Sequence, residues 1–452
     1  MRQTSVVRDK AMMLTNTLRF AAAALCMTSV LALAQDQAPT NVLTLDQAVQ
    51  MAKNKNGDVR AAVLSEKIAR ARVDGARAEF FPTITPSYTY NSRRVQLLNP
   101  TGGGKLFTQS EGGTTTVNAT WRLLDFGERG FNLSSATEEA RAAEADSLQT
   151  LRQVLFQVYS TYYNTLRSQE LVTAAAAQVT RAQSIYDATA AQVEVGQTAK
   201  KDLLQAQADL ANSRVQQFAA QNALSNAQAS LKALIGMPST TQLPSLVSST
   251  PPSATLELPT LDDMIQAGMQ NREDLISARK RTNSLKYSAQ SAQRQATASV
   301  GLDATFTQEL TPNTLQDRAF VLSVSLPWLD FGRSKAQARE AKFSYEASKS
   351  SLVQTERTAQ AEIESAYQDV KQNAERLKAA QEAIDAAKQN FDAAAESQKL
   401  GVGTVVDVIT AQASLATAES DYVQALYDYD TSVVQLRLVT GQSIPGEEAA
   451  RQ

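Results

Sequence analysis

The tetrapeptide Leu124-Asp125-Phe126-Gly127 recurs unchanged as Leu329-Asp330-Phe331-Gly332, 205 positions later in the chain. In both places it stands between a segment of alternating polar and apolar residues and a long segment without Gly or Pro. Glycine permits a sharp bend and aspartate can cap a new helix, so the tetrapeptide predicts a strand-to-helix junction. Two such junctions predict a chain built from two similar halves.

The repeat extends over most of the chain. The spacing of 205 residues also relates Gly196 to Gly401, Asp202 to Asp407 and Gly236 to Gly441. Near the start of each half, Thr44-Leu45-Asp46 matches Thr260-Leu261-Asp262 at a spacing of 216, so the first half has the longer loop in between. We divide the chain into repeats at 35–237 and 260–441, a connector rich in Pro, Ser and Thr at 238–259, and a C-terminal tail at 442–452.

Residues 1–34 have the pattern of an export signal. Basic residues precede an apolar run at 20–34, which ends in the small-x-small sequence Ala32-Leu33-Ala34. Four basic residues and one acidic residue lie in this segment, so its removal changes the net charge from −2 to −5. A mature chain with that charge offers no basic surface for nucleic acid.

The composition narrows the possible chemistry. The chain has no His, and its single Cys, Cys26, lies within the expected signal. Imidazole bases, thiol nucleophiles and the commonest zinc ligands are therefore missing from the mature chain, and we expect no catalytic residue, metal site or cofactor. No mature segment approaches the ~18 consecutive apolar residues of a membrane-spanning helix, so entry into a membrane would require a β-barrel.

Each half predicts the same order of elements. A first helix over 45–79 or 261–297 is followed by two strands with period-two alternation. The strands are expected near residues 84–90, 114–126, 298–307 and 320–328, with joining loops at about 96–113 and 308–318. Tilted transmembrane strands need about 9–11 residues, which suits these segments.

Two very long helices dominate the chain. Residues 131–195 and 333–400 contain neither Gly nor Pro, and at ~1.5 Å per residue each helix would be ~100 Å long. A short glycine-containing break follows each one, and 199–235 or 405–440 then returns as a second helix. Alanine favours helix but buries little apolar area, so these hairpins are expected to pack in a closed assembly. A coiled-coil stalk is the alternative.

Four strands cannot close a barrel by themselves. Open edges in lipid would leave backbone groups unpaired, at a cost of several kcal/mol each. Two copies or three copies would supply an even number of strands and close the barrel, and strand number does not choose between them. The sequence therefore predicts a mostly helical channel with a transmembrane β-barrel portion and helices that project into water.

The sequence resembles the TolC family of outer-membrane efflux and secretion channels over essentially the whole mature chain. The likeness rests on the paired Leu-Asp-Phe-Gly junctions and on the segments 202–206 and 407–411, Asp-Leu-Leu-Gln-Ala and Asp-Val-Ile-Thr-Ala, after the glycine-containing breaks. It implies a homotrimeric channel-tunnel in the bacterial outer membrane, with a 12-stranded barrel, a 12-helix periplasmic tunnel and an equatorial collar at the connector and C-terminal region. It also implies docking onto a periplasmic adaptor that serves an inner-membrane transporter, in an efflux pump or a type I secretion system.

The first group of candidate residues lies where the long helices reverse. Glycine supplies the turn conformation there. The resemblance adds that the exposed turns form the adaptor-docking surface at the periplasmic tip. The residues are Gly196, Gln197, Thr198, Gly401, Gly403 and Thr404.

The second group opens the returning helices. Asp202 and Asp407 lie in first turns, where a carboxylate meets the helix dipole favourably, and Thr404 with Asp407 has the spacing of a capping box. The alternative is that Asp407, repeated by symmetry, forms an acidic ring at the entrance. Thr410 stands where some relatives have a second acidic residue, and Gln398 and Gly403 stand where they have a Tyr and Arg latch, so we expect a differently built gate.

The remaining candidates are structural. Asp125, Gly127, Asp330 and Gly332 are expected to form the strand-to-helix junctions. Phe81, Trp121 and Trp328 lie near the expected periplasmic strand ends and predict an aromatic girdle, with simple packing as the alternative.

Three other classes of protein fit less well. A periplasmic adaptor also has a signal and a helical hairpin, but it would need Gly- and β-rich domains around one hairpin. A coiled-coil scaffold has no use for the four alternating segments. A secreted enzyme lacks any convergent set of catalytic residues. The sequence does not indicate whether drugs, metals or proteins are transported.

Overall fold

The computed structural model describes residues 42–98, 105–247, 258–310, 316–326 and 330–447. The expected signal, Trp328 and the middle of the connector lie outside these ranges. The described chain divides into two units. The smaller one holds β1 (Val42–Leu43) and β4 (Ser245–Leu246), which pair in parallel. Strand β4 falls within the connector, for which the sequence predicted no regular element.

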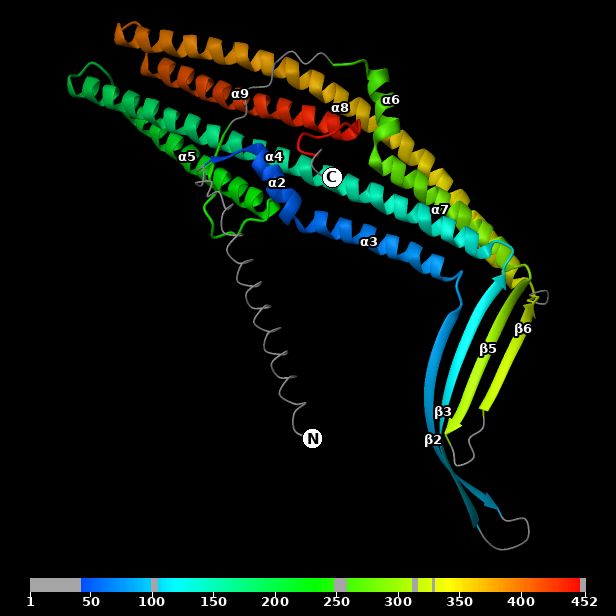
Figure 1. Ribbon diagram of the computed structural model, residues 1–452. Coiled ribbons are helices and arrows are strands. Elements are labelled where there is room, and N and C mark those ends of the chain that lie inside the picture. The colour runs from blue at the N-terminus through cyan, green and yellow to red at the C-terminus, as the bar shows by residue number, and fades with distance from the viewer. Residues whose placement is uncertain (1–41, 99–104, 248–257, 311–315, 327–329, 448–452) are drawn as a thin grey trace, which may run out of the picture. The chain divides into compact units, whose positions relative to one another are not determined.

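The larger unit contains a four-stranded antiparallel sheet in the order β2-β3-β5-β6 (Figure 1). Its strands are β2 (Thr83–Leu98), β3 (Lys105–Leu124), β5 (Ser299–Leu310) and β6 (Gln316–Ser325). The two halves meet where β3 pairs with β5, from Gly113 opposite Leu310 to Leu124 opposite Val300. Strands β2 and β6 are therefore the two edges of the sheet.

The first hairpin corrects the predicted loop at 96–113. Strands β2 and β3 pair without interruption from Thr83 opposite Thr120 to Leu98 opposite Lys105. The extra length of the first half therefore lies mostly in a longer pair of strands. Glycine is depleted in strands, so the pair Gly112-Gly113 hid the alternating pattern.

Each first helix is broken in two, where the sequence predicted one continuous helix. The four pieces are α2 (Leu45–Lys55), α3 (Gly57–Ala78), α6 (Leu261–Asn271) and α7 (Glu273–Gln295). At the first break, the Asn56 side chain accepts hydrogen bonds from the N–H groups of Asp58 (2.8 Å) and Val59 (3.4 Å). Asn56 therefore caps α3 and fixes the break.

The returning helix of each half ends against that break. These helices are α5 (Lys200–Leu234) and α9 (Val405–Val439), and the left-handed glycines Gly236 (φ 69°) and Gly441 (φ 67°) follow them. A Cβ atom on Gly236 would lie 2.7 Å from Cβ of Lys55, and one on Gly441 would lie 2.5 Å from the carbonyl carbon of Asn271. Only glycine fits this close approach.

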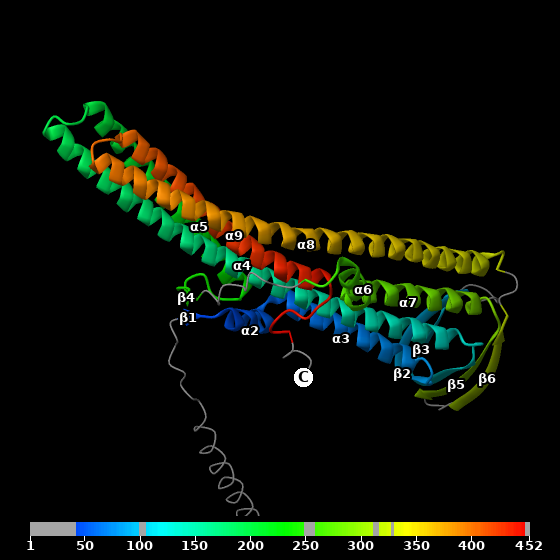
Figure 2. The same cartoon turned by 90° about the horizontal axis from the view of Figure 1, so that it is seen from above.

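The long helices α4 (Glu128–Glu194) and α8 (Arg333–Lys399) have 67 residues each. Near the sheet the packing order is α3, α4, α7, α8 (Figure 2), and towards the helix reversals it is α5, α4, α9, α8 (Figure 1). Helix α4 is thus inside both rows, while α8 is at one edge and α3 and α5 are at the other. None of the helices in the described ranges is both long enough and apolar enough to cross a membrane.

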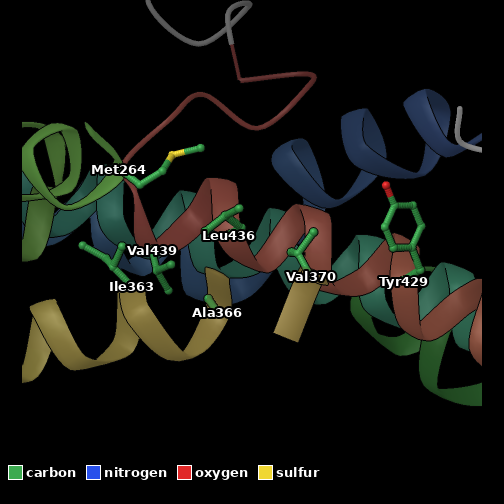
Figure 3. Close-up of a cluster of buried hydrophobic side chains, with 7 residues drawn as sticks. All are labelled: Met264, Ile363, Ala366, Val370, Tyr429, Leu436 and Val439. Carbon is green, nitrogen blue, oxygen red and sulfur yellow. The ribbon is translucent and has the colours of Figure 1, made fainter. Parts of the chain in front are cut away.

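The buried core is formed from small clusters between neighbouring helices. Figure 3 shows the cluster that joins α6, α8 and α9, formed by Met264, Ile363, Ala366, Val370, Tyr429, Leu436 and Val439. Another cluster joins α3 to α4 through Ala69, Val73 and Ala140. Alanine allows close helix packing but contributes little apolar burial, which leaves the edges of each row important for stability.

The expected C-terminal tail is packed as far as Glu447. The Lys53 ammonium donates to the Gly446 carbonyl at 3.0 Å. The Arg152 guanidinium lies 3.0 Å from the Glu447 carboxylate, and both side chains are almost fully buried. Because Lys53 is on α2 and Arg152 is on α4, this segment joins the end of the second half to the first half.

Gly441→Ala should destabilise the protein. A left-handed conformation costs an L-residue ~1–2 kcal/mol, and the new Cβ would overlap the backbone at Asn271. The midpoint temperature of thermal unfolding should fall by at least ~3 °C. Gly130→Ala is the control, since a Cβ on this helical residue meets no atom within 4 Å. Equal unfolding temperatures for the two variants would contradict the close approach described for Gly441.

Candidate functional site

The four-stranded sheet has one apolar face and one polar face. In the registers, Trp121 lies opposite Leu302, which in turn lies opposite Leu322, so the three share a face. The apolar face also carries Ile84, Tyr88, Tyr90, Val117, Phe306, Phe320 and Val324. Phe320 is 79% exposed and Leu322 65%, so this face presents a large apolar surface. Such a surface requires lipid or a protein partner.

Two of the three predicted girdle residues lie at the end of the sheet next to the helices. Phe81 is 70% exposed and Trp121 is 40% exposed. The indole N–H of Trp121 donates to the Phe80 carbonyl at 3.0 Å, which fixes the ring at the start of β2. The third residue, Trp328, is outside the described residues, so the girdle stays a prediction.

The strand-to-helix junctions have the same backbone in both halves. Phe126 (φ 50°) and Gly127 (φ 97°) are both left-handed, as are Phe331 (φ 52°) and Gly332 (φ 92°). Left-handed phenylalanine is uncommon, and the sequence predicted a bend at the glycines alone. Two consecutive left-handed residues turn the chain sharply from the strand into the long helix.

The aspartates of these junctions accept hydrogen bonds from the first turns of the long helices, as predicted. Asp125 accepts from the N–H groups of Gly127 (3.1 Å) and Arg129 (3.2 Å). Asp330 accepts from those of Gly332 (3.0 Å) and Ser334 (2.8 Å). Both carboxylates therefore satisfy backbone donors that the helix itself leaves unpaired.

The first junction is also tied by a side chain that sequence reasoning missed. Arg129 is buried, pairs with Asp125, donates to the Glu79 carbonyl at 3.0 Å and lies 4.9 Å from the centre of the Phe80 ring. Burial acts to raise the pKa of Asp125, but hydrogen bonds from Arg129 and from two backbone N–H groups outweigh it and lower that pKa. The second half has Ser334 at the position of Arg129.

The predicted tip residues lie at the two helix reversals, where five residues separate each long helix from its returning helix. At the first tip, Gly196 is left-handed (φ 73°) and its N–H donates to the Val193 carbonyl at 3.0 Å. The N–H of Gln197 donates to the Gln192 carbonyl at 2.8 Å. This is the Schellman pattern, and it shows how Gly196 supplies the turn conformation predicted for it.

The second tip repeats this pattern and exposes apolar side chains. Gly401 is left-handed (φ 77°), and the N–H of Val402 donates to the Ser397 carbonyl at 3.0 Å. Gly403 is closely packed, because a Cβ there would lie 3.1 Å from the Gln398 nitrogen, which is tighter than ordinary van der Waals contact. Val402 is 81% exposed, so the second tip presents an apolar surface to solvent.

Asp407 and Thr404 form the predicted capping box. The Asp407 N–H donates to the Thr404 hydroxyl at 3.2 Å, and the Thr404 N–H donates to the Asp407 carboxylate at 2.9 Å. Hydrogen bonds from the Thr404 hydroxyl and N–H lower the pKa of Asp407. Asp407 and Thr410 are both exposed, while Asp202 lies in the first turn of α5 without capping that helix. Entrance roles for these residues stay a prediction.

The family model described as outer membrane efflux protein matches residues 48–237 and 264–442. This chain belongs to the outer membrane efflux protein family. Its two matched segments cover most of the chain and correspond to one helix–sheet–hairpin unit each.

Relatives and solved structures agree with this family. The outer membrane protein TolC of Vibrio cholerae is 22% identical over 413 residues, which cover 88% of this chain and 90% of the relative. The outer-membrane channel OprN has a TM-score of 0.77 at 21% identity, with 88% of this chain and 90% of that chain covered. The outer membrane protein VceC from Vibrio cholerae has a TM-score of 0.75 at 19% identity, with 88% and 96% covered.

Membership of the outer membrane efflux protein family confirms the main expectations. The protein is an efflux channel protein of the outer membrane, and its fold is the predicted pair of mostly helical repeats with a shared sheet. The family is one of transport proteins, not of enzymes. The adaptor and scaffold alternatives receive no support from these matches.

Besides Arg129, two further structural residues of this efflux protein were missed by sequence reasoning. Asn56, followed by Gly57 and Asp58, is a helix-capping signal inside a segment that was taken as one helix. Arg152 is a single basic residue among the apolar residues around Leu155, and such a residue in a buried segment indicates a buried ion pair.

Asp125→Ala should destabilise the protein more than Asp330→Ala. Removing Asp125 leaves the buried Arg129 guanidinium without its carboxylate, and breaking a buried pair costs ~3–5 kcal/mol. Asp330 makes the same backbone contacts but has no arginine at the matching position. Chemical unfolding of both variants measures the difference. A greater loss from Asp330→Ala would show that Arg129 does not stabilise the first junction.

Proposed function

We propose that three copies of this chain close around one axis into an exit duct through the outer membrane. Their sheets would join into a barrel, and their helices would continue it as a tunnel into the periplasm. Four strands from each copy give twelve, an even number of the kind that outer-membrane barrels have. The observation that carries this proposal is the position of the exposed apolar side chains.

Apart from Val406 at the start of α9, the exposed large apolar side chains on the described helices are found on the edge helices. In the described part of the chain, α4 and α7 expose no large apolar side chain, and both have helices on two sides. The edge helices α3, α5 and α8 expose Val63, Leu64, Ile68, Leu204, Val215, Phe218, Phe343 and Val353. A ring in which α8 of one copy covers α3 and α5 of the next would bury these side chains.

The sheet supports the same closure. Its edge strands β2 and β6 run in opposite directions, because each pair between them is antiparallel. Strand β6 of one copy can therefore pair with β2 of the next as one more antiparallel pair. Closure would satisfy the edge backbone groups, which lipid cannot do.

We further propose that the helix tips bind a periplasmic adaptor that connects the duct to an inner-membrane transporter. The exposed Val402 and the adjoining turn form a surface suited to such a partner. The duct would then serve a tripartite efflux pump or a type I secretion system. A relative of 27% identity over 243 residues is named as a pyoverdine export outer membrane protein in Pseudomonas putida, and this chain's own cargo is left open.

Asp407→Asn should lower the cation selectivity of the reconstituted channel. Three Asp407 carboxylates at the entrance would attract cations. Because hydrogen bonds from Thr404 lower the pKa of Asp407, cation selectivity should persist as the pH falls towards the ordinary pKa of an aspartate and should be lost only in more acidic solution. Reversal potentials in planar bilayers measure this, and Asp407→Glu is the control that keeps the charge. Unchanged selectivity in Asp407→Asn would contradict an entrance role for Asp407. Absence of conductance in the wild-type protein would contradict the proposed duct.

Val402→Asp should abolish efflux without preventing channel assembly. The charge would lie in the middle of the apolar surface of the second tip, where adaptor contact is proposed. Efflux in a strain deleted for the native channel measures function, and bilayer conductance of the variant is the control. Full efflux by Val402→Asp would contradict docking at this tip.

A further inference from the structure

We propose that neighbouring subunits join through a copy of the internal contact between α4 and α7, made by α8 of one subunit and α3 of the next. In this seam, Ile68 faces Glu340 of the partner subunit and Leu64 faces Phe343 of the partner subunit. The inference rests on the proposed trimer and adds the register and chemistry of its interface.

The repeat is preserved closely enough to carry residue numbers from one half to the other. Helices α4 and α8 begin at Glu128 and Arg333 and both have 67 residues, so a shift of 205 relates them throughout. Helices α3 and α7 begin at Gly57 and Glu273, a shift of 216. The junction and tip hydrogen bonds also repeat at the shift of 205.

The internal contact between α4 and α7 is defined by short distances. The hydroxyl oxygens of Ser135 on α4 and Ser284 on α7 are 3.0 Å apart. The Lys280 ammonium on α7 lies 3.5 Å from the Glu138 carboxylate on α4. These two pairs fix both the direction and the register of the contact.

The residues of the contact between subunits are obtained by replacing each helix with the equivalent helix of the other repeat. Helix α4 becomes α8, so Ser135 becomes Glu340 and Glu138 becomes Phe343. Helix α7 becomes α3, so Ser284 becomes Ile68 and Lys280 becomes Leu64. In a ring of copies, α8 and α3 are the helices that meet, because they are the opposite edges of one row.

Exposure supports this correspondence. Ser284 is 6% exposed, while its counterpart Ile68 is 55% exposed. Glu138 is 9% exposed, while its counterpart Phe343 is 61% exposed. The same backbone positions are thus covered inside the row and open at its edges, as expected of an interface that lacks its second copy.

A surface hollow lies on the part of α8 that the seam would use. It is lined by Ala336, Arg339, Glu340, Phe343, Ser344 and Ala347. Most of these residues recur every three or four positions and form one stripe along the helix. At the matching position on α4, Ala142 is fully buried, whereas its counterpart Ala347 is exposed on α8.

The chemistry of the seam differs from that of the internal contact. Inside the chain, Arg281 pairs with Asp146 and Lys280 pairs with Glu138. Between subunits the first pair becomes Ser65 with Ser351 of the partner subunit, and the second becomes Leu64 with Phe343 of the partner subunit. These two charged pairs are replaced by an apolar pair and a small polar pair, which suits a permanent interface, while the Ser135–Ser284 pair becomes Ile68 next to Glu340 of the partner subunit.

The tip end of the row gives the same result independently. Tyr186 on α4 packs against a cluster that contains the buried Ile409 on α9, together with Val405 and Ala206. The repeat converts Tyr186 and Ile409 to Phe391 on α8 and Leu204 on α5 of the partner subunit. Leu204 is 56% exposed, although Ile409 is only 9% exposed. Both ends of the helix row therefore indicate one continuous seam.

Cysteine cross-linking tests the register. Ile68→Cys and Glu340→Cys are combined in the full-length chain with Cys26 replaced by Ala. The serine hydroxyls at the matching internal positions are 3.0 Å apart, so cysteines in this geometry are within reach of a disulfide. Oxidation of the assembled protein in membranes should give covalent dimers and trimers on a denaturing gel, and reduction should return them to monomer.

Two further pairs serve as controls. Ser135→Cys with Ser284→Cys should form a disulfide within one chain and give no covalent oligomer. Ile68→Cys with Lys342→Cys should give none either, since Lys342 is ~160° around α8 from Glu340. If the protein is trimeric and the internal pair oxidises but Ile68→Cys/Glu340→Cys does not cross-link, the register is wrong. If the protein is monomeric, the proposed duct itself fails.

Discussion

The central constraint on this structure is that both the sheet and the row of helices have open edges. A four-stranded sheet leaves backbone groups unpaired along β2 and β6, and a row of helices leaves apolar side chains uncovered on α3, α5 and α8. Lipid offers no hydrogen-bond partners for the unpaired backbone groups, and exposure of the apolar side chains to water is unfavourable. The open strand β2 and the edge helices α3 and α5 belong to the first repeat, and β6 and α8 belong to the second. Contact with further copies would therefore cover the strand edges and the helix edges together.

The duplication explains why a single chain has unlike environments at equivalent positions. At the first strand-to-helix junction Asp125 and Arg129 are buried and Phe126 is 50% exposed, whereas Phe331 at the second junction is fully exposed. The backbone conformations of the two junctions are nevertheless the same. Backbone geometry was therefore retained in both halves, while side chains changed according to whether a helix lies inside the row or at its edge.

The sequence predicted the parts of the fold that depend on local patterns. Periodicity, glycine and capping residues predicted the long helices, their glycine reversals, the aspartate caps and the approximate positions of the strands along the chain. The break at Asn56 was missed although it has a local capping signal, whereas the break at Arg272 has no side-chain cap and is stabilised by close packing against the end of α9. Arg129 was missed because its partners Glu79 and Phe80 are distant in sequence.

The central claim is that one chain is an incomplete unit and that three are needed. Native mass spectrometry of the mature protein, extracted from outer membrane in detergent, counts the copies directly. The account predicts a single dominant species of three chains that persists on dilution. A monomer or a dimer as the dominant species would contradict it.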